Sequence, residues 1–216
     1  MCRGSILFIS LVFLFGSAAG ITYADIKSDL VGYWPLDGDA TDASGNGVDG
    51  TVVGNVEWVM GMFGEGIRLD GSSRVELPDF SLTTDVITFS AWINGWKVAD
   101  WGGIVSSRFP SATEMIFGDN DTLHYVWNND SSQTWSWSDG PSIPPDEWVM
   151  VALKVEPSGA TAYVYSEAQG LQQATNAIAH VEQPVAGLNI GWVDCCGGGR
   201  YFQGVIDEVR HRIVEK

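Results

Sequence analysis

Tryptophan is the residue whose abundance and spacing in this chain most readily suggest chemistry. Ten tryptophans stand among the 216 residues, and six of them lie in or beside polar, glycine-rich stretches. An indole ring can stack on the C–H face of a sugar ring, while nearby amide, carboxylate and guanidinium groups can hydrogen-bond to its hydroxyl groups. Trp135-Ser-Trp137 would place two indoles on one side of an extended segment. The predicted ligand-binding residues are Trp96, Trp101, Arg108, Trp127, Asn128, Trp135, Trp137 and Trp192.

Each of these six tryptophans could instead pack in the core or within a loop, and we expect at least two to form an exposed platform. The loop Asp194–Arg200 is expected to border the same face. The other four tryptophans occupy β-rich segments and are predicted to lie in the core. They are Trp34, Trp58, Trp92 and Trp148.

Carboxylate and amide oxygens gather in turn-rich segments near the start of the chain. Calcium takes six to eight such oxygen ligands. The sequence offers Asp37, Asp42, Asn46, Asp49 and Asp70 as candidates, with glycines between them. The alternative is that these residues simply form turns, which Asp, Asn and Gly favour.

The two cysteines outside the N-terminal segment, Cys195 and Cys196, are adjacent. They could form a vicinal disulfide, remain two thiols, or bridge to another chain, and the sequence leaves these alternatives open. A zinc site is not expected, because adjacent cysteines are poorly placed as tetrahedral ligands and no histidine spacing supports one.

Short β-rich runs separated by Gly, Asn, Asp and Ser must position all of these residues, and sustained helical periodicity is absent. In the segment 86–93, Ile87, Phe89, Ala91 and Ile93 share one face. In the segment 148–155, alternate residues from Val149 to Val155 do the same. The run 157–160 between two strand signals predicts a hairpin turn. The pattern predicts an all-β fold, a two-sheet antiparallel β-sandwich or jelly roll.

Residues 1–24 have the features of a signal peptide, with Arg3, an apolar run from Ile6 to Phe15, and small residues after it. Cleavage is expected after Ala19 or Ala24. The domain would then span residues 25–216, and loss of Arg3 takes the formal charge from −16 to −17. Such a charge disfavours nucleic acid as a partner, and we expect no membrane insertion of the mature chain.

Six segments, in order along residues 31–210, resemble the laminin-G-like jelly roll of the concanavalin A-like lectin/glucanase superfamily. They are Val31-Gly-Tyr-Trp-Pro-Leu-Asp-Gly38, Asp42-Ala-Ser-Gly-Asn-Gly-Val-Asp-Gly50, Gly61-Met-Phe-Gly-Glu-Gly-Ile-Arg-Leu-Asp-Gly71, Phe89-Ser-Ala-Trp-Ile93, Asp146-Glu-Trp-Val-Met-Val-Ala152 and Phe202-Gln-Gly-Val-Ile-Asp-Glu-Val-Arg210.

The resemblance implies two antiparallel sheets packed face to face, with the first and last strands side by side. It brings Asp207 close to the first strand, so that Asp207 joins the candidate calcium ligands. Calcium would then be a structural ion, as in many members of this family.

Catalysis is not expected from this sequence. Catalytic relatives with this sandwich carry a Glu-x-Asp-x-(x)-Glu run on one strand, and no such run occurs here. His124 is predicted to be a strand residue, and His180 and His211 surface residues; none has a catalytic context.

The leading interpretation is a secreted or cell-surface carbohydrate-binding, lectin-like module with a structural calcium ion. The alternative is a protein–protein adhesion or extracellular surface-assembly domain, so the expected partner is a glycan or an extracellular protein. A glycan-cleaving enzyme ranks third.

Overall fold

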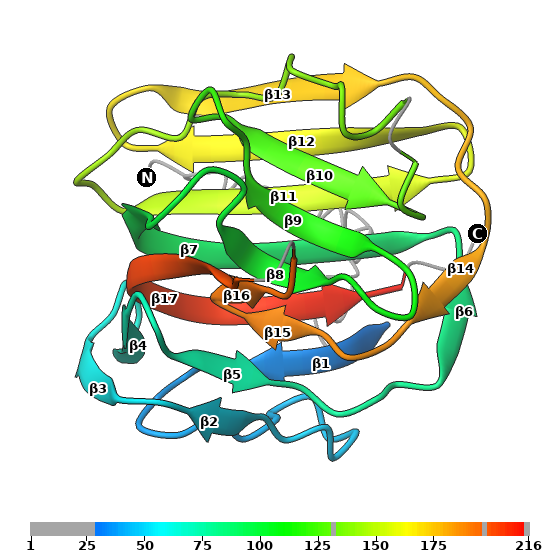
Figure 1. The fold of residues 1–216 in the computed structure, drawn as a ribbon. Coiled ribbons are helices and arrows are strands. Elements are labelled where there is room, and N and C mark those ends of the chain that lie inside the picture. The colour runs from blue at the N-terminus through cyan, green and yellow to red at the C-terminus, as the bar shows by residue number, and fades with distance from the viewer. Residues whose placement is uncertain (1–28, 131–132, 196–197, 214–216) are drawn as a thin grey trace, which may run out of the picture.

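The computed structural model describes residues 29–130, 133–195 and 198–213, which form an antiparallel β-sandwich (Figure 1). The predicted signal peptide lies outside the described residues. Within the described part of the chain, no helix is long and apolar enough to cross a membrane.

The larger sheet follows the strand order β13-β12-β11-β7-β17-β4-β3, and both β1 and β16 also pair with β17. Its strands are β1 (Leu30–Trp34), β3 (Val56–Met60), β4 (Glu65–Asp70), β7 (Ile87–Lys97), β11 (Val149–Glu156), β12 (Gly159–Ser166), β13 (Gly170–Asn176), β16 (Trp192–Val193) and β17 (Arg200–Arg212).

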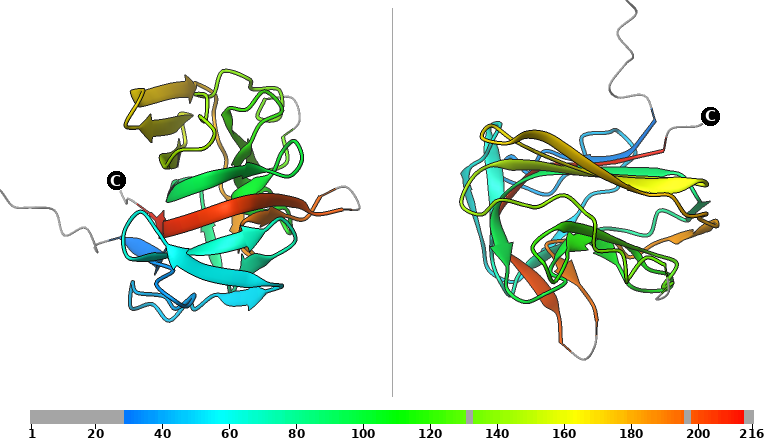
Figure 2. Two further views of the ribbon diagram at one scale, coloured as in Figure 1. Left: turned by 90° about the vertical axis from the view of Figure 1, so that its left-hand side faces the viewer. Right: turned by 90° about the horizontal axis from the view of Figure 1, so that it is seen from above.

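The smaller sheet follows the order β10-β9-β8-β15-β5-β2, and β14 pairs with β6 in a two-stranded ribbon. Figure 2 shows β8–β10 facing β11–β13 across the core. The strands are β2 (Thr51–Val53), β5 (Arg74–Glu76), β6 (Leu82–Thr84), β8 (Gly103–Ser107), β9 (Thr113–Phe117), β10 (Leu123–Trp127), β14 (Gln183–Val185) and β15 (Asn189–Ile190).

The alternation of apolar residues in the sequence explains which side chains are buried at the centre of the large sheet. In β7 the side chains of Ile87, Phe89 and Ile93 are buried, and in β11 those of Val149 and Val155 are buried beside them. Apolar side chains on alternate residues reach the same face of a strand, so the two strands present one continuous apolar surface to the core. The β11–β12 connection is the predicted hairpin turn, with Glu156 and Gly159 as its last partners.

The first and last strands of the fold pair with each other, as the family resemblance implied (Figure 1). Trp34 lies opposite Val209, is fully buried, and donates its indole N–H to the carbonyl of Val48 at 2.9 Å. Gly32 is required here, because a Cβ at that position would lie 2.3 Å from the Trp34 ring. The hydrogen bond ties the turn-rich segment at Val48 to β1, which pairs with β17.

Two of the four tryptophans predicted for the core lie elsewhere. Trp34 is in the core and Trp58 packs partly against it, but Trp92 and Trp148 are only half-buried. Trp92 alternates with the buried Ile93, so its side chain points to the outer face of the large sheet.

The prediction that His180 and His211 are surface residues is wrong. Both are buried, whereas His124 lies in β10 as predicted. His180 hydrogen-bonds through Nε2 with the hydroxyl of Tyr125 and through Nδ1 with the carbonyl of Glu156, both at 3.1 Å. Its polar atoms are therefore satisfied inside the protein, which allows its burial.

Candidate functional site

Strands β9 and β10 point alternate side chains into the core and outward. Met115 and Tyr125 belong to the main core, while the outward-facing Ile116 and Val126 form a second apolar cluster against which Trp101 packs. The outer face of the small sheet therefore has an apolar floor where solvent-facing polar residues would be usual.

A cavity of about 280 Å³ lies over this floor, and we call it the small-sheet pocket. Its lining combines two indoles, two guanidinium groups, one carboxylate and the two aliphatic floor residues. The lining residues are Trp101, Arg108, Glu114, Ile116, Val126, Trp135 and Arg200.

The two indoles come from separate loops. Trp101 lies between β7 and β8, is half-buried, and its ring centre is 4.8 Å from that of His124. Trp135 lies in the loop after β10 and remains 38% exposed. The guanidinium of Arg108 lies 4.8 Å from the centre of the Trp135 ring, within the range of a cation–π contact.

Glu114 is the buried charge of the pocket, with only 2% of its surface exposed. Its Oε1 accepts a hydrogen bond from Nη1 of Arg108 at 3.1 Å. Burial raises the pKa of Glu114 to about 7, and the charge of Arg108 opposes that rise. Nη2 of Arg108 also contacts Sγ of Cys195 at 3.3 Å, so several partners hold this guanidinium in place.

Arg200, at the start of β17, brings a second guanidinium to the pocket. Burial lowers its pKa, and the charge of Arg108 lowers it further. The carboxylates of Glu114 and Asp100 act in the opposite direction. The two arginines are therefore close enough for their like charges to interact.

The structure brings together three of the residues predicted to bind ligand, Trp101, Arg108 and Trp135. The loop Asp194–Arg200, expected to border this face, contributes Arg200 to the lining and Cys195 to the contact with Arg108. Their role in binding stays a prediction.

Two predicted binding tryptophans are buried instead. Trp127 is an inward-facing residue of β10 and donates its indole N–H to the carbonyl of Val181 at 2.9 Å. Trp137 packs against Tyr125, with ring centres 5.3 Å apart. Trp135 and Trp137 do not share a side as predicted, because Thr134 and its neighbours form a turn and not an extended strand.

The other predicted residues lie outside the pocket lining. Trp96 packs against Phe117 of the core, with ring centres 5.3 Å apart. Trp192 is covered by the guanidinium of Arg74, 4.3 Å from the ring centre. The Oδ1 of Asn128 accepts a hydrogen bond from Ser111 at 3.3 Å.

Sequence reasoning missed Glu114, Ile116, Val126 and Arg200. One signal was available for Glu114, which interrupts the otherwise apolar or neutral strand Thr113–Phe117. A charged residue in a buried strand needs a partner, and the pattern alone does not say that Arg108 supplies it.

The candidate calcium ligands fall into two groups with separate tasks. In the first, Oδ1 of Asp42 accepts the backbone N–H groups of Tyr33 and Ser44, at 3.0 and 2.8 Å. Oδ1 of Asp49 accepts the N–H of Asp42 at 2.8 Å, and Asn46 donates its amide to the carbonyl of Leu30 at 2.7 Å. These side chains brace the turn itself, and Asp70 likewise accepts hydrogen bonds from Ser72.

In the second group, Asp37 and Asp207 hold the segment 61–65 between them. Asp37 accepts the N–H of Glu65 at 2.7 Å, and Oδ2 of Asp207 accepts that of Phe63 at 2.9 Å. Burial raises the pKa of Asp207 to about 6, and its Oδ1 has no hydrogen-bond partner among the described residues. The six predicted ligands do not converge, and the described residues hold no group of three His, Cys, Asp or Glu that could bind a metal ion.

The proposed pairing of Cys195 involves Cys196, which lies outside the described residues. The vicinal disulfide therefore stays a prediction.

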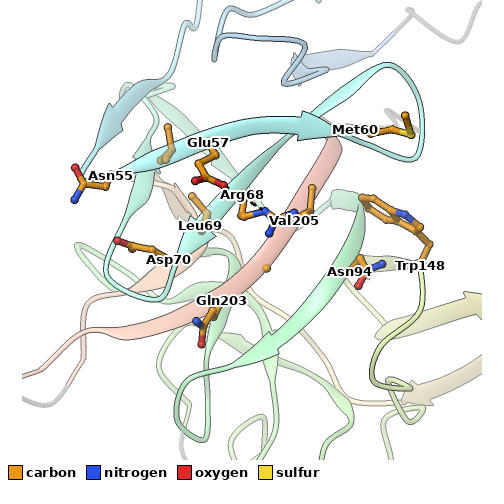
Figure 3. A pocket seen from close by; sticks show the side chains of 12 residues that line it. Asn55, Glu57, Met60, Arg68, Leu69, Asp70, Asn94, Trp148, Gln203 and Val205 are labelled. Atoms are coloured by element: carbon orange, nitrogen blue, oxygen red, sulfur yellow. Dashed lines mark ion pairs between the residues drawn. The ribbon is translucent and has the colours of Figure 1, made fainter.

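A larger and more open groove, of about 710 Å³, crosses the outer face of the large sheet (Figure 3). Met60 and Trp148 lie at one end of it, and Arg68 faces Glu57 at 3.8 Å across its wall. Both partners of this ion pair are more than half exposed, so the pair contributes little to rigidity. The groove offers one indole, whereas the small-sheet pocket offers two beside a buried charge.

Both the sequence and the structure of this chain are similar to those of known proteins. A family model described as "Concanavalin A-like lectin/glucanases superfamily" matches residues 69–211. No curated protein matches the sequence.

Several solved structures share the fold. Domain 4 of AbnA, a GH43 extracellular arabinanase from Geobacillus stearothermophilus solved in complex with arabinotriose, has a TM-score of 0.67 and 21% sequence identity. That comparison covers 86% of this chain and 92% of the arabinanase domain. The binding domain of botulinum neurotoxin serotype G has a TM-score of 0.62 and 12% identity, over 86% of this chain and 48% of that chain. Trypanosoma rangeli sialidase has a TM-score of 0.61 and 15% identity, over 87% of this chain and 31% of that chain.

Proposed function

The chain belongs to the concanavalin A-like lectin/glucanase superfamily, and from that premise we propose that it is an exported carbohydrate-binding module whose site is the small-sheet pocket. The observation that carries the proposal is the joint placement of Trp101 and Trp135 over the floor of Ile116 and Val126. Ligand sites combine apolar walls with a few fixed polar groups, and the Arg108–Glu114 pair supplies such groups here.

In this proposal, the ring face of a sugar packs against the exposed part of Trp135. The guanidinium groups of Arg108 and Arg200 donate hydrogen bonds to its oxygen atoms. The cation–π contact with Arg108 restrains the Trp135 indole before the ligand arrives, which lowers the entropic cost of binding. That domain 4 of the arabinanase was solved with arabinotriose supports a sugar as the ligand class.

We also propose that the pocket binds sugar without cleaving it. Glycoside hydrolysis requires two carboxylates on opposite sides of the scissile bond. Among the described residues that line the pocket, Glu114 is the one carboxylate, and it is paired with Arg108.

The test is a glycan array probed with the wild-type protein and with two matched tryptophan variants. Trp135→Ala is expected to lower affinity for a bound glycan by about 10- to 100-fold, because it removes most of the aromatic contact area. Trp148→Ala, which removes an indole from the groove on the other sheet, is expected to leave affinity unchanged. The reverse result would move the site to that groove.

A blank array from folded protein would overturn the proposal and favour the alternative, a protein adhesion or assembly domain. One observation supports that alternative. The outer face of the large sheet and the adjoining loops expose several large apolar side chains. They are Met60, Phe63, Tyr165 and Leu171.

Calcium binding is a separate proposal. It is supported by the buried, unpartnered Oδ1 of Asp207, with Asp37 on the other side of the segment 61–65. Extracellular calcium modules bind with dissociation constants of about 0.1–1 mM. Calcium at about 2 mM is therefore expected to raise Tm, and a chelator to reverse the rise. Asp207→Asn should abolish the shift, whereas Asp70→Asn should not. Equal Tm values with calcium and with chelator would refute the proposal.

A further inference from the structure

Strand β13 forms one rim of the large sheet, with β12 on one side and no described strand on the other (Figure 2). It pairs with β12 along its whole length, from Gly170 to Asn176. Four of its seven side chains are exposed. The peptide groups along its outer side have no partner strand among the described residues, so this rim is a template on which another strand can pair.

The other three ends of the two sheets are protected against such pairing. β2 has three residues, and all five residues of β10 are buried. β3 carries a charge at Glu57, which faces Arg68 at 3.8 Å. Short length, burial and charge are devices by which natural proteins keep sheet edges from pairing. β13 is the longest of the four end strands and contains no charged residue and no proline.

The lack of charge on this rim indicates what kind of strand would pair with it. The chain as a whole has a formal charge of −16, so two copies repel each other over most of their surfaces. Neither β12 nor β13 contains a charged residue, and the nearest one, Glu167, lies in the turn between them. A basic partner would find no carboxylate on β13 to attract it, whereas a second copy presents an equally neutral strand. Antiparallel pairing about a two-fold axis sets β13 against itself.

An apolar row on the outer face of the large sheet runs to the same rim. Its members lie opposite one another on β7, β11, β12 and β13, and they are Trp92, Met150, Tyr165 and Leu171. Leu171, the last of them, remains 58% exposed at the open edge. A strand added beside β13 would bring side chains to about 5 Å from Leu171, measured between Cβ atoms, and so cover part of its exposed surface. The row therefore gives the pairing an apolar contact in addition to its backbone hydrogen bonds.

We propose that two copies of the chain associate through β13, antiparallel about a two-fold axis, so that the two large sheets become one continuous sheet. Pairing centred on Gln173, the middle residue of the strand, lets all seven residues of each copy take part and places the two Gln173 side chains next to each other. The inference does not depend on the proposed function. Where that function holds, the dimer carries two sugar sites.

Sedimentation equilibrium of the whole protein over a wide range of concentrations measures the association. The average mass is expected to rise from that of one chain toward that of two. Added salt should strengthen the dimer, because it screens the repulsion between two acidic chains, whereas an interface built on opposite charges would weaken. Hydrogen exchange locates the contact. The amides of β13 should exchange more slowly in concentrated protein, and those of β3 at the other end of the sheet should not change.

Variants assign the association to the rim. Leu171→Asp is expected to weaken the dimer by at least about 10-fold, since it removes the apolar contact and adds a charge to the edge. Gln173→Glu should raise Kd about 5-fold, because like charges would face each other across the paired strands. Gln203→Glu makes the same change on β17 and should leave Kd unchanged. Leu171 and Gln173 are both exposed, so these variants should keep the fold.

A mass equal to that of one chain at every concentration would overturn the proposal. So would a dimer in which the β13 amides exchange as they do in dilute protein, or which Leu171→Asp and Gln173→Glu leave unchanged, because the copies would then meet elsewhere. None of these results bears on the glycan measurements, so failure of this proposal and failure of the proposed function can be told apart.

Discussion

Arg108→Ala is expected to destabilise the protein by about 3–5 kcal/mol, because it leaves Glu114 buried without its ion-pair partner. Only 2% of the Glu114 side chain is exposed, so water cannot replace the lost guanidinium. The variant should also lose glycan binding, since Arg108 contacts the Trp135 ring that forms one wall of the pocket. Urea unfolding and a glycan titration measure the two effects.

The loss of stability should depend on pH in a defined direction. Burial already raises the pKa of Glu114 to about 7, so in the wild-type protein the folded state binds this proton more tightly than the unfolded state. The contribution of this group to stability is therefore greatest below pH ~4.5 and declines as the pH rises to about 7. Removing Arg108 raises the pKa further, so the decline continues to higher pH.

The difference in unfolding free energy between wild type and Arg108→Ala should accordingly be larger at about pH 8 than at about pH 5. Lys154→Ala is the matched control, because its ion pair with Glu156 spans 2.9 Å but is well exposed. This control should cost less than about 1 kcal/mol at either pH. A loss in Arg108→Ala that is equally small at both pH values would show that the buried pair does not stabilise the protein.

His211→Leu is expected to make the protein more resistant to acid. His211 is fully buried between the rings of Phe80 and Phe89, with ring centres 5.3 and 4.9 Å away. Neither of its nitrogens has a hydrogen-bond partner among the described residues. Burial lowers the pKa of His211 to about 3, so the folded protein keeps this ring neutral.

The sign of the effect follows from the pKa of His211, which is about 3 in the folded chain and about 6.5 in the unfolded chain. Below pH ~6.5 the unfolded chain binds a proton at His211 and the folded chain does not, so stability falls as the pH drops from about 6.5 to about 3. Each unit of difference between the folded-state and unfolded-state pKa corresponds to about 1.4 kcal/mol of unfolding free energy. At about pH 4 the leucine variant should therefore gain about 3 kcal/mol relative to wild type, beyond any difference at pH ~7.

Urea unfolding at the two pH values measures this gain. At neutral pH His211→Leu should be as stable as wild type or more so, because it removes two unsatisfied buried nitrogens. His180→Leu provides the contrast, since it breaks hydrogen bonds with Tyr125 and Glu156 and should destabilise the protein at both pH values. An unchanged difference between wild type and His211→Leu from pH ~7 to pH ~4 would contradict the expected protonation behaviour.

The fold could be predicted from the sequence because its strongest signals are local. The alternation in β7 and β11 comes from side chains two residues apart, which always share a face of a strand. Edge strands such as β13 give no such local signal. β13 lies at the edge of the large sheet, and most of its residues are exposed or half-buried, so it carries no apolar alternation.

The candidate site could be predicted only in part. Trp101, Arg108 and Trp135 were recognised from their residue types and polar surroundings, and the structure gathers them in one pocket. Trp127 and Trp137 share those properties in the sequence and yet are buried. Glycine-rich or polar neighbours indicate a loop or a strand end, but they do not indicate which way an indole turns.

The sequence by itself determined the all-β sandwich, the residues of its central strands that face the core, and the composition of its turns. These features follow from periodicity and from residue types a few positions apart. The tertiary structure alone decided that Glu114 meets Arg108 and Arg200, that Trp135 is exposed beside them, and that His211 is sealed in the core. Arg108 and Glu114 are six residues apart, but their pairing depends on how the connection between β8 and β9 turns. The rings of Phe80 and Phe89 that enclose His211 come from a distant part of the chain. Burial, and with it the pKa and the strength of every charge in the pocket, is a property of that packing and is not encoded in any single segment.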